Sequence, residues 1–182
     1  MFFCDSLILN DDERLALIAL TSAKKSELLY RGSRDGFTPP AMHSKCDNRT
    51  NLVSIIQSNT NYIFGAYTSV PWNSTSTWTK DPNAFIHSIR RGGISKTDKF
   101  MIKTNVPGVF YGSAGGGPDS IFYYNDIIVF NQSNTTVRSK CHLGQYYQLP
   151  EGITADSAEA INFLAGNHNQ WLTTEIEVYQ IQ

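Results

Sequence analysis

Beyond residue 50, the chain is a succession of short segments rich in β-branched and aromatic residues, and this pattern constrains the fold most. Clusters of Gly, Pro, Asn and Asp separate the segments, as is typical of strands joined by turns. Parallel strands would need regular intervening helices, and the middle of the chain lacks a helical pattern. We therefore predict an α+β, mainly β fold in which two antiparallel sheets form a β-sandwich with short flanking helices. The segments are NLVSIIQ, YIFGAYTSV, NAFIHSI, KFMIK, VFYG, SIFYYNDIIVF and TEIEVYQI.

The N-terminal part carries the clearest helix signals. Asn10 suits an N-cap, and Glu13 stands three residues later, where the partner in a capping box belongs. Apolar residues three apart, such as Leu15 and Ile18, then predict a helix over about residues 11–21. The 182 residues suffice to bury a core, so we expect a single domain over 1–182 with a β-rich core over about 27–181.

Composition bears on the partners and on the cellular compartment of the protein. The net charge is −1 and the basic residues are scattered, which does not favour nucleic acid. The longest apolar run, LALIAL, is far shorter than the ~20 residues of a membrane-spanning helix. Cys4, Cys46 and Cys141 are odd in number and far apart, which argues for a reducing compartment. We therefore expect a cytoplasmic protein that does not insert into a membrane.

Two motifs suggest a metal or a phosphate, and both are weak. His43 and Cys46 share a face of a short predicted helix, but the adjacent Cys141 and His142 would point to opposite faces of an extended segment. The glycine-rich stretch GSAGGGPD, residues 112–119, lacks the Lys-Ser/Thr and the following helix of a phosphate loop. We expect no metal and no cofactor.

A charged turn follows the first predicted strand, in the stretch LLYRGSRDGF. Arginine suits bidentate pairing with a carboxylate. We therefore expect Arg31 or Arg34 to pair within the domain, with Asp35, Glu175 and Glu177 as the candidate carboxylates. One arginine is expected to be a buried clamp and the other a surface residue. Glu175 and Glu177 lie two apart in a strand, so they share one face; Ile176 and Val178 should face the core and the glutamates should face outward.

Several short motifs occur in a fixed order along the chain: LLYRGSRDGF, MHSKCDN, YIFGAYTSVPW, DPNAFIHSI, GGGPDSI, LGQYYQLP, FLAG and EIEVY. In this order they resemble the TLDc domain family, over about residues 5–181. Three positions depart from the family pattern. Ala66 stands where a second glycine is common, His87 where an aromatic or aliphatic residue is frequent, and Ala114 where Phe is usual.

The resemblance implies a function that the residues alone do not show. TLDc proteins form two antiparallel sheets in a sandwich, are linked to protection from oxidative damage, and in several cases bind the peripheral sector of the vacuolar-type proton-pumping ATPase. We therefore expect a non-catalytic, protein-binding regulatory domain, with Trp72 and Trp78 as candidate partner anchors. The alternative for both is core or loop packing, which is favoured for Trp72 because it follows Pro71 at the end of a predicted strand. One alternative is an enzyme of unidentified reaction with a pocket near the Arg31–Asp35 turn. Another is peroxide scavenging by thiols. We predict that thiol chemistry is not the mechanism.

Overall fold

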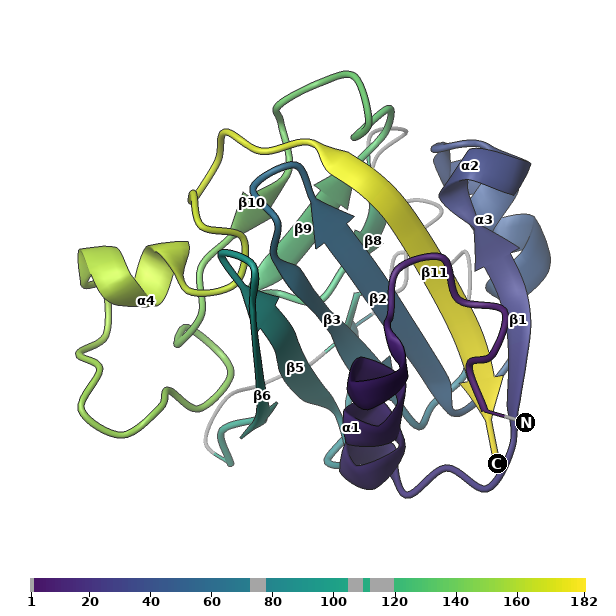
Figure 1. Cartoon of the computed structure of the whole chain (residues 1–182), viewed down its shortest axis with the longest axis horizontal. Coiled ribbons are helices and arrows are strands. Elements are labelled where there is room, and N and C mark those ends of the chain that lie inside the picture. Colours follow the sequence, from purple (N-terminus) through teal and green to yellow (C-terminus); the bar gives the residue numbers. More distant parts are fainter. Residues whose placement is uncertain (1, 73–77, 105–109, 112–119) are drawn as a thin grey trace.

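A computed structural model describes residues 2–72, 78–104, 110–111 and 120–182 (Figure 1). The chain is a mainly β, α+β structure, as the sequence predicted. Its helices are α1 (Asp11–Thr21), α2 (Gly32–Asp35), α3 (Pro39–Cys46) and α4 (Ala158–Asn162). Its strands are β1 (Ser26–Arg31), β2 (Leu52–Ser58), β3 (Ile63–Thr68), β4 (Trp78–Thr79), β5 (Phe85–Arg91), β6 (Ile94–Met101), β7 (Phe110–Tyr111), β8 (Ser120–Tyr123), β9 (Ile127–Phe130), β10 (Lys140–Cys141) and β11 (Thr173–Ile181).

The strands form two antiparallel sheets. The larger sheet has the order β1-β11-β2-β3-β5-β6, and the smaller sheet has the order β10-β9-β8-β7-β4. Short hairpins explain the neighbours β2–β3 and β5–β6, because antiparallel strands can be joined by tight turns. The last strand, β11, instead runs between β1 and β2 and so brings both ends of the chain together (Figure 1).

Helix α1 begins as the sequence predicted, with the same bounds. The Asn10 side chain accepts from the backbone N–H of Glu13 at 2.9 Å, and the Glu13 carboxylate accepts from the backbone N–H of Asn10 at 3.0 Å. Two otherwise unpaired N–H groups of the first turn are thereby satisfied. The helix ends at Ser22, which adopts the left-handed conformation with φ 54°.

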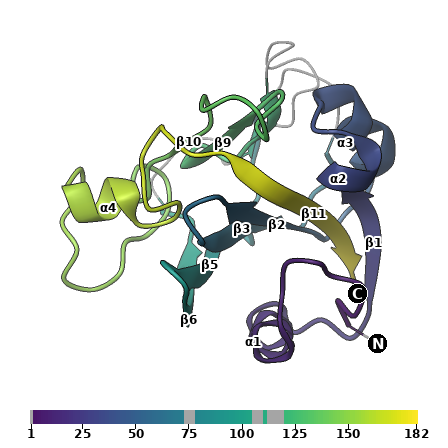
Figure 2. The same ribbon diagram turned by 45° about the horizontal axis from the view of Figure 1, so that its top comes forward.

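Both faces of the larger sheet are covered. Figure 2 shows α1 on one face and β9 and β10 of the smaller sheet on the other. Along β11, Ile176 and Val178 belong to a buried cluster that also contains residues of the smaller sheet, whereas Tyr179 and Ile181 belong to a second buried cluster with α1. Strand residues alternate between faces, so β11 is buried on both sides.

Glu175 and Glu177 therefore lie on the α1 side of β11. The prediction that they face outward was wrong, because both are buried. The physical reason is that residues preceding α1, together with α2, cover this face of the sheet. An alternating pattern shows which side chains share a face, but it does not show whether that face is exposed to solvent.

Candidate functional site

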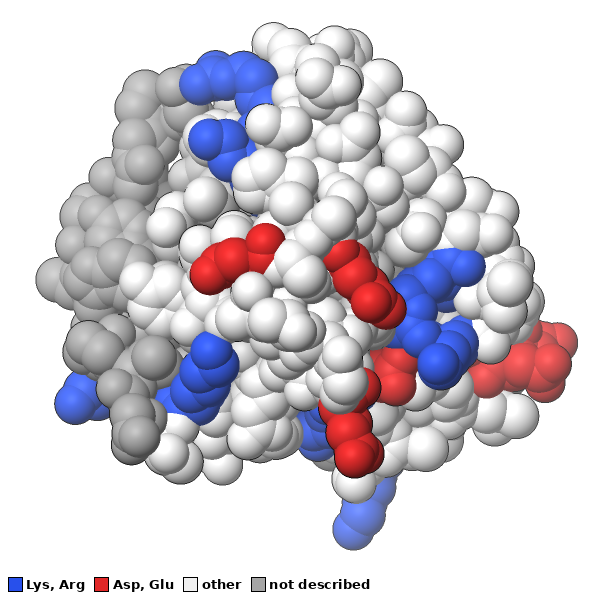
Figure 3. All heavy atoms as spheres, turned by 90° about the vertical axis from the view of Figure 1, so that its left-hand side faces the viewer, with Lys and Arg blue, Asp and Glu red and all other residues white. Residues whose placement is uncertain are grey.

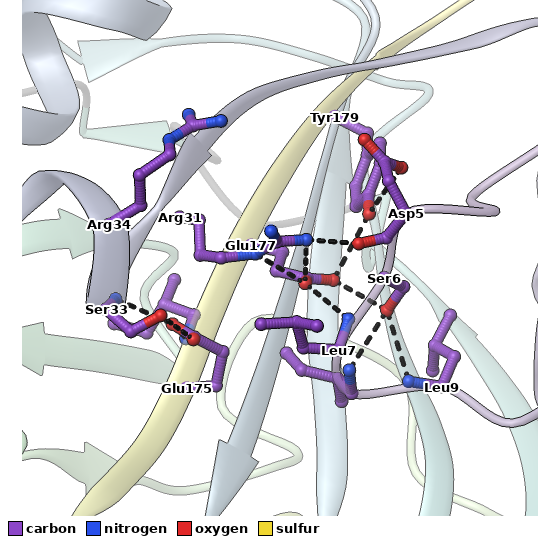
Figure 4. Close-up of polar contacts among 12 residues, drawn as sticks. Asp5, Ser6, Leu7, Leu9, Arg31, Ser33, Arg34, Glu175, Glu177 and Tyr179 are labelled. Carbon is purple, nitrogen blue, oxygen red and sulfur yellow. Dashed lines mark hydrogen bonds and ion pairs between the residues drawn. The ribbon is translucent and has the colours of Figure 1, made fainter.

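The charged turn and the end of β11 meet in one polar cluster, drawn in Figure 4. Its centre is Glu177, whose side chain is fully buried. The strands β1 and β11 pair in a register that puts Arg31 directly opposite Glu177. The Arg31 guanidinium donates to one carboxylate oxygen from Nε at 3.1 Å and from Nη2 at 2.9 Å. A buried carboxylate needs such a partner, because losing water costs a charged group several kcal/mol.

The segment before α1 supplies most of the other donors to Glu177, and the Tyr179 hydroxyl of β11 donates to Oε2 at 3.3 Å. The Ser6 hydroxyl donates to Oε2 at 2.7 Å, and the backbone N–H of Leu7 donates to Oε1 at 2.8 Å. Ser6 Oγ in turn accepts from the backbone N–H groups of Ile8 and Leu9 at 3.2 and 3.1 Å. Arg31 also donates to the backbone carbonyl of Asp5. Glu177 and Arg31 therefore pin the N-terminal segment onto the sheet. Nothing in the sequence of this segment predicted that role, because it depends on which strand lies beneath it.

Glu175 has a separate partner on the same face. Its carboxylate accepts from the backbone N–H of Ser33 at 3.0 Å and from the Ser33 hydroxyl, which holds the start of α2 against β11 (Figure 4). The same carboxylate accepts from the N–H of Ile176 at 2.9 Å. The two glutamates thus belong to two different clamps and do not form one acid–base pair.

Arg34 behaves differently from Arg31. It pairs with Asp35 at 2.7 Å, and its side chain is 46% exposed, whereas that of Arg31 is 14% exposed. The hydrogen bond from Arg34 lowers the pKa of Asp35. Asp35 also accepts from the backbone N–H of Arg31 at 2.9 Å. Both arginines pair with candidate carboxylates, Arg31 with the buried Glu177 and Arg34 with Asp35 nearer the surface. That the Arg31 pair stabilises the fold as a clamp stays a prediction.

A second buried ion pair was missed by the sequence analysis. Arg90, on β5, donates to the two carboxylate oxygens of Glu13 at 2.7 and 2.6 Å, and Ser95 donates to the same carboxylate at 2.9 Å. Burial alone would raise the pKa of Glu13, but these hydrogen bonds and the N–H of Asn10 outweigh it and lower the pKa. The capping residue of α1 therefore also fastens the helix to the sheet. Its spacing predicted only the first of these two roles.

A comparison with protein families identifies the domain to which these residues belong. The family model for the TLDc domain matches residues 3–182. The chain belongs to the TLDc domain family. No curated protein sequence matches it. The match begins at Phe3, so it includes the segment that lies over Glu177.

In this TLDc domain the candidate metal ligands are used elsewhere. His43 Nδ1 lies 2.7 Å from Asp47, and His142 Nε2 lies 2.9 Å from Asp156. Within the ranges that the structure describes, no group of three His, Cys, Asp or Glu is placed to hold a metal ion. Likewise, none of the helices in those ranges is both long enough and apolar enough to cross a bilayer.

Of the two tryptophans considered as partner anchors, Trp72 is the one whose side chain the structure describes. Trp72 is buried in the main cluster, with its ring 5.9 Å from that of Tyr124, so it is a core residue and not an exposed anchor. Its place after Pro71 at the end of a predicted strand had favoured packing over an anchor role, and the structure agrees. The side chain of Trp78 lies outside the described residues, as do the glycine-rich stretch 112–119 and Ala114.

The thiols differ sharply in their surroundings. Cys46, the last residue of α3, and Cys141, on β10, are buried, and burial raises the pKa of both thiols. Cys4 is exposed. Because the thiolate is the reactive form, buried thiols of raised pKa are inert.

We expect a thiol reagent such as dithionitrobenzoate to modify one cysteine rapidly in the native domain and three in urea. Cys4→Ser should abolish the rapid phase and leave the two slow thiols. Rapid native modification that survives in Cys4→Ser would contradict this assignment of Cys46 and Cys141.

Asp126 is a buried carboxylate that the sequence analysis did not single out. It precedes β9, and four consecutive backbone N–H groups of residues 144–147 donate to it at 2.8–3.3 Å. Burial raises the pKa of Asp126 to about 6, although the four donors act in the opposite direction. The carboxylate orders the turn between β10 and the following segment.

This carboxyl should make stability depend on pH. Its folded pKa of about 6 exceeds the ~3.9 of an unfolded aspartate, so between these values the folded protein binds the proton more readily. The stabilisation is then complete below about pH 4 and is lost as the pH rises through about 6. Asp126→Asn cannot titrate. We expect the free energy of unfolding of the wild type, relative to this variant, to fall by about 1–3 kcal/mol between pH 4 and pH 7 in urea melts. If the difference in free energy of unfolding between the wild type and Asp126→Asn did not change with pH, Asp126 would not have the raised pKa.

Proposed function

We propose that this TLDc domain is a non-catalytic, protein-binding regulatory domain of the cytoplasm. Its leading partner is the peripheral sector of a vacuolar-type proton-pumping ATPase, and protection from oxidative damage is the expected outcome. Membership of the family over residues 3–182 supports this, because the resemblance links TLDc domains to both roles. We also propose that the two sheets form the expected sandwich; the buried cluster with residues of both sheets supports it.

The observation that carries the proposal is the internal use of the charged turn. Glu175 and Glu177 bond to Ser33, Ser6, Leu7 and Arg31 of the same chain. A general acid or base has to reach a proton of the substrate. Glu177 is fully buried, and both of its carboxylate oxygens already accept hydrogen bonds from groups of this chain. These residues therefore support docking of a rigid domain better than turnover at the Arg31–Asp35 turn.

The proposal predicts a direct physical association. Purified protein at micromolar concentration should bind the isolated peripheral sector of the pump and change its ATP hydrolysis or its assembly. Arg34→Ala is a suitable control, because this exposed residue can be changed without touching the Glu177 clamp. Absence of association, together with a turnover of some substrate that a folded Arg34→Ala abolishes, would replace this function with the enzymatic one.

A further inference from the structure

The strand β6 is an edge of the larger sheet, and among the residues that the structure describes only part of this edge is paired. At its C-terminal end, the segment 146–148 runs beside it. The N–H of Gln148 donates to the carbonyl of Met101 at 2.9 Å, the N–H of Lys103 donates to the carbonyl of Tyr146 at 2.9 Å, and Ile102 bridges to Tyr147. This edge therefore accepts an added strand, because the chain itself supplies a short one.

The added strand stops at a definite place. Pro150 follows two residues after Gln148, and proline has no N–H with which to continue a ladder. In a regular antiparallel strand, alternate residues present their N–H and C=O groups to the same side. Because the Met101 carbonyl points away from β5, Lys99 presents its backbone N–H and C=O to the open side as well. The pairing of β5 with β6 is regular from His87–Lys99 to Phe85–Met101, so this alternation holds there.

A cavity of about 450 Å³ lies where the two segments part. Lys96 and Asp98 of β6 line one side, and Pro150, Glu151 and Glu159 line the other. Figure 3 shows the corresponding face of the molecule, where acidic and basic side chains lie side by side. The cavity is therefore bounded by an open strand edge and by the segment that has just left it.

Some charged side chains that line the cavity are paired with each other, and others are not. Arg91 pairs with Asp98 and lies over the ring of Phe163, 4.3 Å from its centroid, so these two charges are neutralised and held in place. Glu151 and Glu159 have no ion pair or hydrogen-bonding partner for their carboxylates among the described residues, and neither has the ammonium group of Lys96. Two free carboxylates against one free ammonium leave an excess of negative charge, which suits a cationic side chain.

We propose that the open edge of β6 binds an extended segment of a partner protein by adding a strand, with a lysine or arginine of that segment seated between Glu151 and Glu159. Backbone hydrogen bonds to Lys99 and its neighbours provide the pairing, as in other cases of strand addition. Ile94, at the start of β6, is 72% exposed and offers the added strand an apolar contact. A second copy of this chain fits less well, because β6 would bring its own Lys96 and Lys99 to the junction, and lysines on an edge oppose self-pairing.

The test begins with selection of random dodecapeptides displayed on phage against the intact chain. Enriched peptides should carry Lys or Arg with apolar residues at alternate positions. A synthetic peptide of the enriched sequence should slow hydrogen exchange of the Lys99 amide at least about tenfold, because that N–H gains a partner only when a strand is added. Binding without protection of Lys99 would overturn the proposal, and so would a failure to enrich any such peptide.

Matched variants separate the backbone from the side chain. Lys99→Pro removes the outward N–H, whereas Lys99→Ala removes the same side chain and keeps the N–H. Lys99→Pro should weaken binding about tenfold relative to Lys99→Ala. The double variant Glu151→Gln, Glu159→Gln should weaken it severalfold and remove the preference for Lys or Arg. Equal affinities for the two Lys99 variants, or a dimer in ultracentrifugation that Lys99→Pro dissociates, would contradict the proposed occupant.

Discussion

Replacement of Arg31 by alanine is expected to lower the free energy of unfolding by about 3–5 kcal/mol. The variant leaves the carboxylate of Glu177 buried without its cation, and the carbonyl of Asp5 loses the same guanidinium. The donors that remain are neutral: the Ser6 hydroxyl and the Leu7 N–H, which lie on the segment that Arg31 helps to hold, and the Tyr179 hydroxyl. Urea melts followed by circular dichroism measure the change.

Arg34→Ala is the matched control for this prediction. Arg34 carries the same charge three residues away, but its own side chain is 46% exposed, and without it Asp35 keeps the backbone N–H of Arg31 as a donor. Exposed ion pairs contribute about 0–1 kcal/mol. We therefore expect the two variants to differ by several kcal/mol. Equal midpoints for Arg31→Ala, Arg34→Ala and wild type would show that the Glu177 cluster is not a clamp.

Gly65→Ala is expected to cost about 3 kcal/mol or more, because the added methyl group has no room. A Cβ at Gly65 would overlap the backbone carbonyl oxygen of Ser54 on the neighbouring strand and would lie 2.9 Å from Nε2 of His87. His87 crosses over Gly65 from β5, and its Nε2–H donates to that same carbonyl at 3.1 Å. Burial lowers the pKa of His87 to about 4, so the ring is neutral at pH 7 and fits this buried site without a counter-ion.

Two comparisons make the expected result for Gly65 specific. The double variant Gly65→Ala, His87→Ala should not recover the lost stability, because the overlap with the Ser54 backbone remains. Gly152→Ala adds the same methyl group where nothing lies within 4 Å, at φ +83°, so it should cost only about 1–2 kcal/mol from its backbone conformation. Thermal and urea unfolding of the wild type, the two single variants and the double variant would measure these differences in stability. A Gly65→Ala variant no less stable than Gly152→Ala would show that the strands can separate to make room.

Local chemistry in the sequence was enough for the elements and for the family. Asn10 and Glu13 specified where α1 begins, since a capping box needs only two residues three apart. Short β-branched segments joined by turn residues predicted antiparallel strands, because such connections are too short for a parallel crossover. The order of the motifs placed the chain in the TLDc family, and the family match over residues 3–182 agrees.

The tertiary structure decided which polar groups are buried and what they bond to. The alternation of Glu175 and Glu177 with Ile176 showed that the glutamates share a face, but not that residues 5–9 would cover it. That covering depends on β11 being inserted between β1 and β2, a pairing over about 150 residues of sequence that no local pattern encodes. The burial of Trp72, the second role of Glu13 and the open edge of β6 have the same origin. Each depends on a neighbour that is distant along the chain, so only the packed structure determines it.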